Sequence, residues 1–167
     1  MKKNSLILLL IGCCFGLANA QQGKALASPK ISNGIKLNLS KELKLVKAYL
    51  FFEGGEHLDA SNTADLNQNV KMMIQIDGGG WVEKDQKVSI GASEKITTSL
   101  GSVILNEPDL FATFTDIGAE DAQYITLKAV INSITNKKIK FFTVSFTIWD
   151  KWGTGKITGS YRFKIRE

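Results

Sequence analysis

The carboxyl-terminal part of the sequence shows the clearest alternation of apolar and polar positions. Apolar side chains recur at every second residue over 142–148 and again over 157–165. Period-two alternation is typical of strands with one buried face. Gly153 and Gly155 lie between the two runs and suit a tight reversal of the chain. We therefore predict a β-hairpin with these cross-strand pairs: Phe142 with Phe163, Val144 with Tyr161, Phe146 with Gly159 and Ile148 with Ile157.

Similar but shorter patterns predict strands along the rest of the chain. We expect them over 35–40, 42–52, 70–77, 81–90, 94–100, 102–106 and 125–131, and one helical turn at 109–114. In the second of these, Leu43, Leu45, Tyr49 and Phe51 share a side. Ile96, Val103 and Leu105 are further core candidates. About nine strands without a long helix predict an all-β antiparallel β-sandwich, immunoglobulin-like or C2-like.

The amino terminus predicts export. Lys2 and Lys3 precede an apolar run of about 12 residues and the triplet Ala18-Asn19-Ala20, which is typical of a signal peptide over residues 1–20. The run is shorter than the roughly 20 residues that span a bilayer. An alternative is a lipobox at 10–13, in which case Cys13 carries a lipid and the membrane is reached only through that anchor. We expect a disordered lead-in over 21–30 and one sandwich domain over 31–167, located in the periplasm, at the outer membrane or outside the cell.

The composition limits the reactive groups and the partners that we expect for the exported part. Both cysteines, Cys13 and Cys14, fall in the leader, so the remaining 147 residues offer no disulfide and no thiolate. Removing the two leader lysines lowers the formal charge from +5 to +3. The remaining lysines alternate along strands, whereas a nucleic-acid-binding face would gather them on one side with aromatic residues. We therefore expect no nucleic-acid partner.

The acidic residues suggest a calcium site. If the chain reverses at every predicted turn, loops 53–68, 107–122 and 150–155 share one end of the sandwich and carry ten of the sixteen acids. Calcium takes six to eight oxygen ligands, which neighbouring loops can supply. The alternative is that these are ordinary solvated loops, because no EF-hand spacing is present. The candidate ligands are Glu53, Asp59, Asp116, Asp121 and Asp150.

The tryptophans, the histidine and the spacing of the acids favour a binding function over a catalytic one. Trp81, Trp149 and Trp152 are candidates for stacking on a carbohydrate or for anchoring a protein interface, although packing explains large aromatics equally well. His57 is the one histidine, and no nucleophile motif accompanies it. Nothing in the spacing of the acids selects a pair for a carboxylate-pair hydrolase. We expect no enzyme activity and no cofactor except calcium.

Several short segments resemble a known group of proteins. They are G-A-S at 91–93, L-G-S-V-I-L at 100–105, D-L-F at 109–111, A-E-D-A at 119–122 and W-D-K-W-G-T-G-K-I at 149–157. Together they resemble small exported β-sandwich proteins and lipoproteins of Bacteroidota, a group without an assigned function. The resemblance implies an exported sandwich and no catalytic residue. The sequence thus predicts a protein-interaction or assembly module at the cell envelope, with calcium or carbohydrate binding as the alternative.

Overall fold

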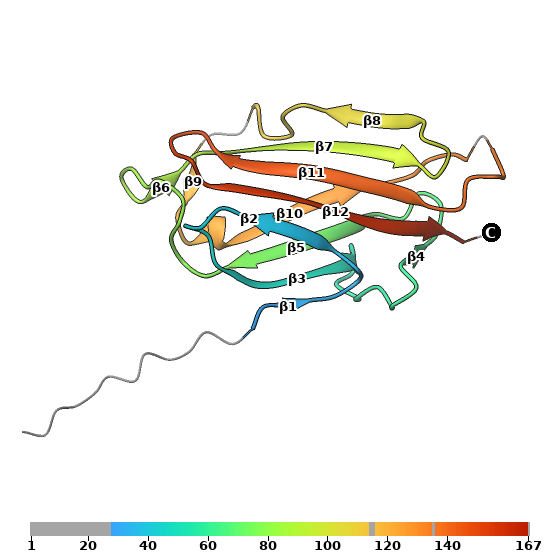
Figure 1. Cartoon of the computed structure of the whole chain (residues 1–167), viewed down its shortest axis with the longest axis horizontal. Helices are drawn as coiled ribbons and strands as arrows, with labels where there is room; N and C mark the ends of the chain where they lie inside the picture. The colour runs from blue at the N-terminus through green and yellow to red at the C-terminus, as the bar shows by residue number, and fades with distance from the viewer. Residues whose placement is uncertain (1–27, 114–115, 135, 167) are drawn as a thin grey trace, which may run out of the picture.

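A computed structural model describes residues 28–113, 116–134 and 136–166 and shows an antiparallel β-sandwich. The predicted leader, Cys13 and residues 21–27 of the predicted lead-in lie outside the described residues. Within the described residues, no helix is long and apolar enough to cross a membrane. Figure 1 shows two layers of strands with β6 and β9 at one end and the end of β12 at the other.

The smaller layer, sheet A, has the strand order β1-β3-β5-β10. Its inner face comes from alternate residues of β5 and β10, as the sequence predicted, with Val70, Ile74 and Leu127 each 2% exposed or less. Lys30 lies in β1, although we expected residues 21–30 to be disordered. The strands are β1 (Lys30–Ile31), β3 (Leu45–Phe52), β5 (Val70–Ile76) and β10 (Tyr124–Ala129).

The larger layer, sheet B, has the order β2-β12-β11-β7-β8, and β4 also pairs with β12. The β11–β12 hairpin has the predicted register at all four pairs, including Phe142 with Phe163 and Phe146 with Gly159. Its apolar face is buried against sheet A. The strands are β2 (Lys36–Leu39), β4 (Thr63–Ala64), β7 (Ile90–Thr98), β8 (Val103–Glu107), β11 (Phe142–Asp150) and β12 (Lys156–Ile165).

Two strand predictions and the predicted helical turn were wrong in detail. The segment 81–90 does not cross the sandwich; it contributes β6 (Lys87–Val88), which pairs with β9 (Ile117–Gly118), and Ile90, the first residue of β7. Ala48 and Leu50 fill the core from β3, rather than Tyr49 and Phe51, because a bulge follows Leu45 and reverses which residues point inward. In the 109–114 segment the described residues form a turn, and the one short helix is η1 (Asp121–Gln123).

The β8 strand departs furthest from its predicted role. Val103 and Leu105 were expected in the core, but they are 50% and 38% exposed. Within the described residues, β8 is the edge of sheet B and pairs with β7, with an irregularity in register between Val103 and Leu105. Val103 lies opposite Thr97 on the outer face of the sheet, and Leu105 lies opposite Ile96 at the open edge, so both side chains stay partly in solvent.

The strand registers define two ends of the sandwich. We call the end that carries the turn after Asp150 the hairpin end, and the end that carries Ile165 the C-terminal end. Asp150 pairs with Ile90, and its carboxylate accepts a hydrogen bond from the Val82 amide, so residues 77–89 lie at the hairpin end. Lys164 pairs with Thr63, which places the 53–69 loop at the C-terminal end.

Candidate functional site

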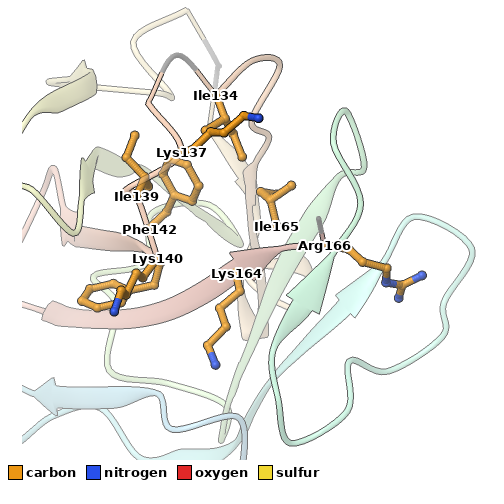
Figure 2. Close-up of a pocket in the computed structure, with 9 residues that line it drawn as sticks. Ile134, Lys137, Ile139, Lys140, Phe142, Lys164, Ile165 and Arg166 are labelled. Carbon is orange, nitrogen blue, oxygen red and sulfur yellow. The ribbon is translucent and has the colours of Figure 1, made fainter.

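A hollow lies at the C-terminal end, between the segment that leads into β11 and the end of β12. Its volume is about 910 Å³. We call it the basic hollow because four of its nine lining residues are cationic and none of the nine is acidic. Figure 2 shows them: Ile134, Lys137, Ile139, Lys140, Phe141, Phe142, Lys164, Ile165 and Arg166.

Backbone hydrogen bonds fix the first wall of the basic hollow. A turn forms where the Asn136 carbonyl accepts from the Ile139 amide at 3.0 Å and the Asn136 side chain accepts from the Lys138 amide at 2.9 Å. The Lys140 amide then donates to the Ser99 hydroxyl at 2.9 Å. The Ser99 amide donates back to the Phe141 carbonyl, also at 2.9 Å. These bonds tie the wall to the β7–β8 turn.

The second wall is the carboxyl end of β12. The amides of Lys164 and Arg166 each donate at 2.8 Å to carbonyls of the neighbouring segment, those of Asn62 and Ala64. Alternation along the strand turns Ile165 inward, whereas Lys164 and Arg166 extend outward in Figure 2. Both walls are therefore held by hydrogen bonds from their main-chain amides, and their side chains project from a defined frame.

The hollow combines an apolar floor with a cationic rim. Phe142 is 2% exposed and belongs to the core, and Ile139 and Ile165 pack against it. The guanidinium of Arg162 lies 4.7 Å from the centre of the Phe141 ring and adds a further cation beside the rim. Arg166 pairs with Asp65 at 3.3 Å, but both side chains are more than half exposed, and such pairs are weak. The arrangement suits a ligand that joins negative charge to apolar groups.

The predicted gathering of the acids at one end was wrong. Glu53 and Asp59 lie at the C-terminal end, whereas Asp116, Asp121 and Asp150 belong to the hairpin end. The parity argument failed because it counted 81–90 as a strand that crosses the sandwich. Within the ranges that the structure describes, no group of three or more His, Cys, Asp or Glu residues could hold a metal ion.

Three of the candidate calcium ligands have protein partners. Glu53 accepts hydrogen bonds from Lys71 and Asn69, and these bonds hold its pKa below the usual range. Hydrogen bonding from Ser61 likewise lowers the pKa of Asp59. Asp150 is 5% exposed, and its two carboxylate oxygens accept from the amides of Val82 and Trp152 at 2.6 and 2.8 Å. Calcium binding itself stays a prediction.

The three tryptophans do not form one ligand platform. Trp81 is 8% exposed and donates to the Ala122 carbonyl at 3.3 Å, so its proposed role as an exposed stacking residue was wrong. Trp149 lies on the outer face of sheet B against Gly91. The Lys84 ammonium lies 4.6 Å from the centre of the Trp152 ring. Trp149 and Trp152 are half-buried, and carbohydrate binding there stays a prediction.

A buried carboxyl was not anticipated from the sequence. Glu94 points into the core from β7, between Ala92 and Ile96, and is 1% exposed. Neither of its oxygens has a hydrogen-bond partner among the described residues, and burial raises its pKa to about 7. The Tyr161 hydroxyl is also buried and has no partner in the described part of the chain, and burial together with the charge of Glu94 raises its pKa well above the usual value.

The sequence contains a signal for the basic hollow in two of its segments. K-K-I-K-F-F at 137–142 and K-I-R at 164–166 each mix cations with apolar residues. The predicted pairing of Phe142 with Phe163 already places these two segments side by side. The hollow could therefore have been found from the hairpin register.

Comparisons with known proteins leave the family open. No family model matches the sequence, and no curated protein matches it. Among solved structures, the C-terminal domain of wzt is similar, with a TM-score of 0.49 and 13% sequence identity. The alignment covers 83% of this chain and 82% of that chain. The resemblance to exported sandwich proteins of Bacteroidota stays a prediction.

Proposed function

We propose that this chain is an exported, non-enzymatic binding module of the bacterial cell envelope that holds an anionic, partly apolar component in the basic hollow. The observation that carries the proposal is the composition of that hollow: four cations and no acid among nine lining residues, over an apolar floor. Export is supported by the amino-terminal sequence pattern alone. A protein partner at the cell envelope, as expected from the sequence, would use the same cations if it carried an acidic segment.

Physical chemistry gives each part of the hollow a role. The exposed lysines attract and orient negative charge, a contribution that weakens as ionic strength rises. The exposed Ile134 and the half-buried Ile139 and Ile165 side chains offer apolar surface whose burial gives most of the affinity. The lining contains neither a carboxylate nor a histidine, the groups that most often act as general acid or base. Binding is the activity that this set of side chains supports.

The anionic apolar dye 8-anilinonaphthalene-1-sulfonate provides a direct test. We expect saturable fluorescence enhancement at the folded protein that weakens with added salt. The double substitution Lys140→Glu and Lys164→Glu should weaken binding at least about tenfold, because it reverses two charges on the rim. The matched control is Lys41→Glu with Lys44→Glu, two exposed lysines near the hairpin end, which changes the net charge equally.

The control should bind the dye about as well as the unmodified chain. Equal weakening in both double variants would show that only net charge matters, and unchanged binding in the first would place the dye elsewhere. Either result would contradict the proposed site. Thermal unfolding of each variant establishes that the comparison is between folded proteins.

A further inference from the structure

A second hollow of about 400 Å³ adjoins the basic hollow, and the two share Ile139 and Phe142. The rest of its lining comes from the β7–β8 hairpin on one side and the segment after β10 on the other. These residues are Thr98, Leu100, Ser102, Ile104, Val130, Ile131, Asn132, Ser133 and Asn136. Each hollow has a volume within the roughly 300–1,000 Å³ range typical of small-molecule sites.

Charge is divided sharply between the two hollows. All four cations line the basic hollow, and none of the eleven residues that line the second hollow is charged. An acidic peptide would carry charges along its length and would need cations along its whole path. A ligand with one charged end and a long uncharged portion matches the observed division.

Three of the apolar side chains that line the two hollows are exposed to solvent. Leu100 is 52% exposed, Ile104 is 49% exposed and Ile134 is 38% exposed. Exposed apolar side chains that gather at one place mark interaction sites. Ile104 lies at the register irregularity of β8, the edge strand of sheet B, and Leu100 lies in the turn that precedes that strand. A bound apolar chain would cover both.

We propose that the two hollows together bind a single-chain anionic amphiphile, of the fatty-acid class, from solution. Its carboxylate lies among the cations of the basic hollow, beside Lys137 and Lys140. Its alkyl chain crosses over Ile139 and Phe142 and lies against Leu100 and Ile104 in the second hollow. This inference rests on the proposed function, and it names the chemical class of the component that the module holds.

Competition with the bound dye tests the ligand class. Octanoate, decanoate and dodecanoate, each below its micellar concentration, should displace the dye with affinities that rise about two- to fourfold per methylene. Acetate should not compete. Dodecyl maltoside and dodecyltrimethylammonium, which have the same chain on a neutral or a cationic head, should bind at least about tenfold more weakly than dodecanoate, because the rim favours negative charge.

Substitutions in the second hollow test the contribution of the ligand's alkyl chain to affinity separately from that of its head group. Leu100→Ser combined with Ile104→Ser should weaken dodecanoate binding at least about fivefold, because less apolar surface is buried. The same variant should leave acetate non-competitive and dye binding nearly unchanged. The control is Val46→Ser, at a residue of β3 that is 36% exposed and outside both hollows. It should bind dodecanoate as the unmodified chain does.

The outcomes distinguish this inference from the proposed function. Dye binding that depends on Lys140 and Lys164 but is not displaced by dodecanoate would overturn the amphiphile and leave the anionic site intact. Affinity that is independent of chain length, or equal weakening in the Val46→Ser control, would also overturn it. Binding to vesicles that contain anionic lipid, without binding of free dodecanoate, would replace the soluble ligand by a membrane surface and contradict the inference.

Discussion

The ring of Phe146 on β11 lies over Gly159 on β12, its direct partner across the hairpin. A Cβ at residue 159 would lie 2.5 Å from Cζ of that ring and 2.5 Å from the Lys36 carbonyl oxygen on β2. The glycine therefore lets an aromatic side chain and a neighbouring strand approach the same backbone atom. The close packing of β2, β11 and β12 in sheet B therefore requires a residue without a side chain at position 159.

Gly159→Ala should destabilise the fold by about 2–4 kcal/mol, because the added methyl group meets both a ring and backbone. The measurement is the free energy of unfolding from urea titration, followed by circular dichroism. Gly54→Ala serves as the control, since a Cβ there meets nothing within 4 Å. The control should lie within about 0.5 kcal/mol of the unmodified chain. Equal effects at both positions would contradict the close approach at Gly159.

The buried Glu94 carboxyl should make stability depend on pH. Its folded-state pKa is about 7, against an ordinary value of 4.5, so the folded protein favours the protonated form. Stability is therefore highest below about pH 4.5 and falls as pH rises through 7, and the loss approaches about 3 kcal/mol at high pH. Glu94→Gln should remove this loss, because a neutral amide cannot ionise.

Urea unfolding at a series of pH values from 5 to 9 measures the Glu94 effect. The free energy of unfolding of the Glu94→Gln variant should increase relative to that of the unmodified chain as the pH rises. The two values should be closest at pH 5. Glu83→Gln, at an exposed carboxylate near the hairpin end, should follow the unmodified chain. Parallel curves for the unmodified and Glu94→Gln chains would contradict a raised pKa at this position.

Asp150 should act as a structural link between β11 and the segment after β5. Asp150→Ala leaves the Val82 and Trp152 amides without their charged acceptor and should cost about 3 kcal/mol. Asp150→Asn should cost less, because one amide oxygen still accepts a hydrogen bond. Unfolding in urea measures both variants, with Asp116→Ala at an exposed position as the control. If Asp150→Ala is as stable as that control, the link contributes nothing.

Calcium gives a separate test of the predicted metal site. Because Glu53 and Asp59 lie at the opposite end from Asp116, Asp121 and Asp150, we expect millimolar calcium to leave the melting temperature unchanged. The measurement is a thermal melt with calcium chloride against magnesium chloride at equal ionic strength. A rise specific to calcium that Asp121→Asn or Asp150→Asn abolishes would instead support the metal site.

The sequence determined the elements whose side chains alternate without interruption. The β11–β12 hairpin, its register, and the inner faces of β5 and β10 follow from period-two patterns, because one wrong step would move every apolar side chain to solvent. The basic hollow could also be predicted from the sequence, since the same register brings 137–141 beside 164–166. The sandwich class follows from these patterns together.

Only the tertiary structure decided the features that depend on how two sheets overlap. Because of the bulge after Leu45, Ala48 and Leu50 face the core, and alternation alone does not predict a bulge. The register shift in β8 and its place at the edge of sheet B left Val103 and Leu105 partly in solvent, although their sequence suits a core strand equally well. The burial of Glu94 likewise depends on what covers its side of β7. A strand's sequence specifies which residues share a face, whereas the neighbouring layer determines whether that face is buried.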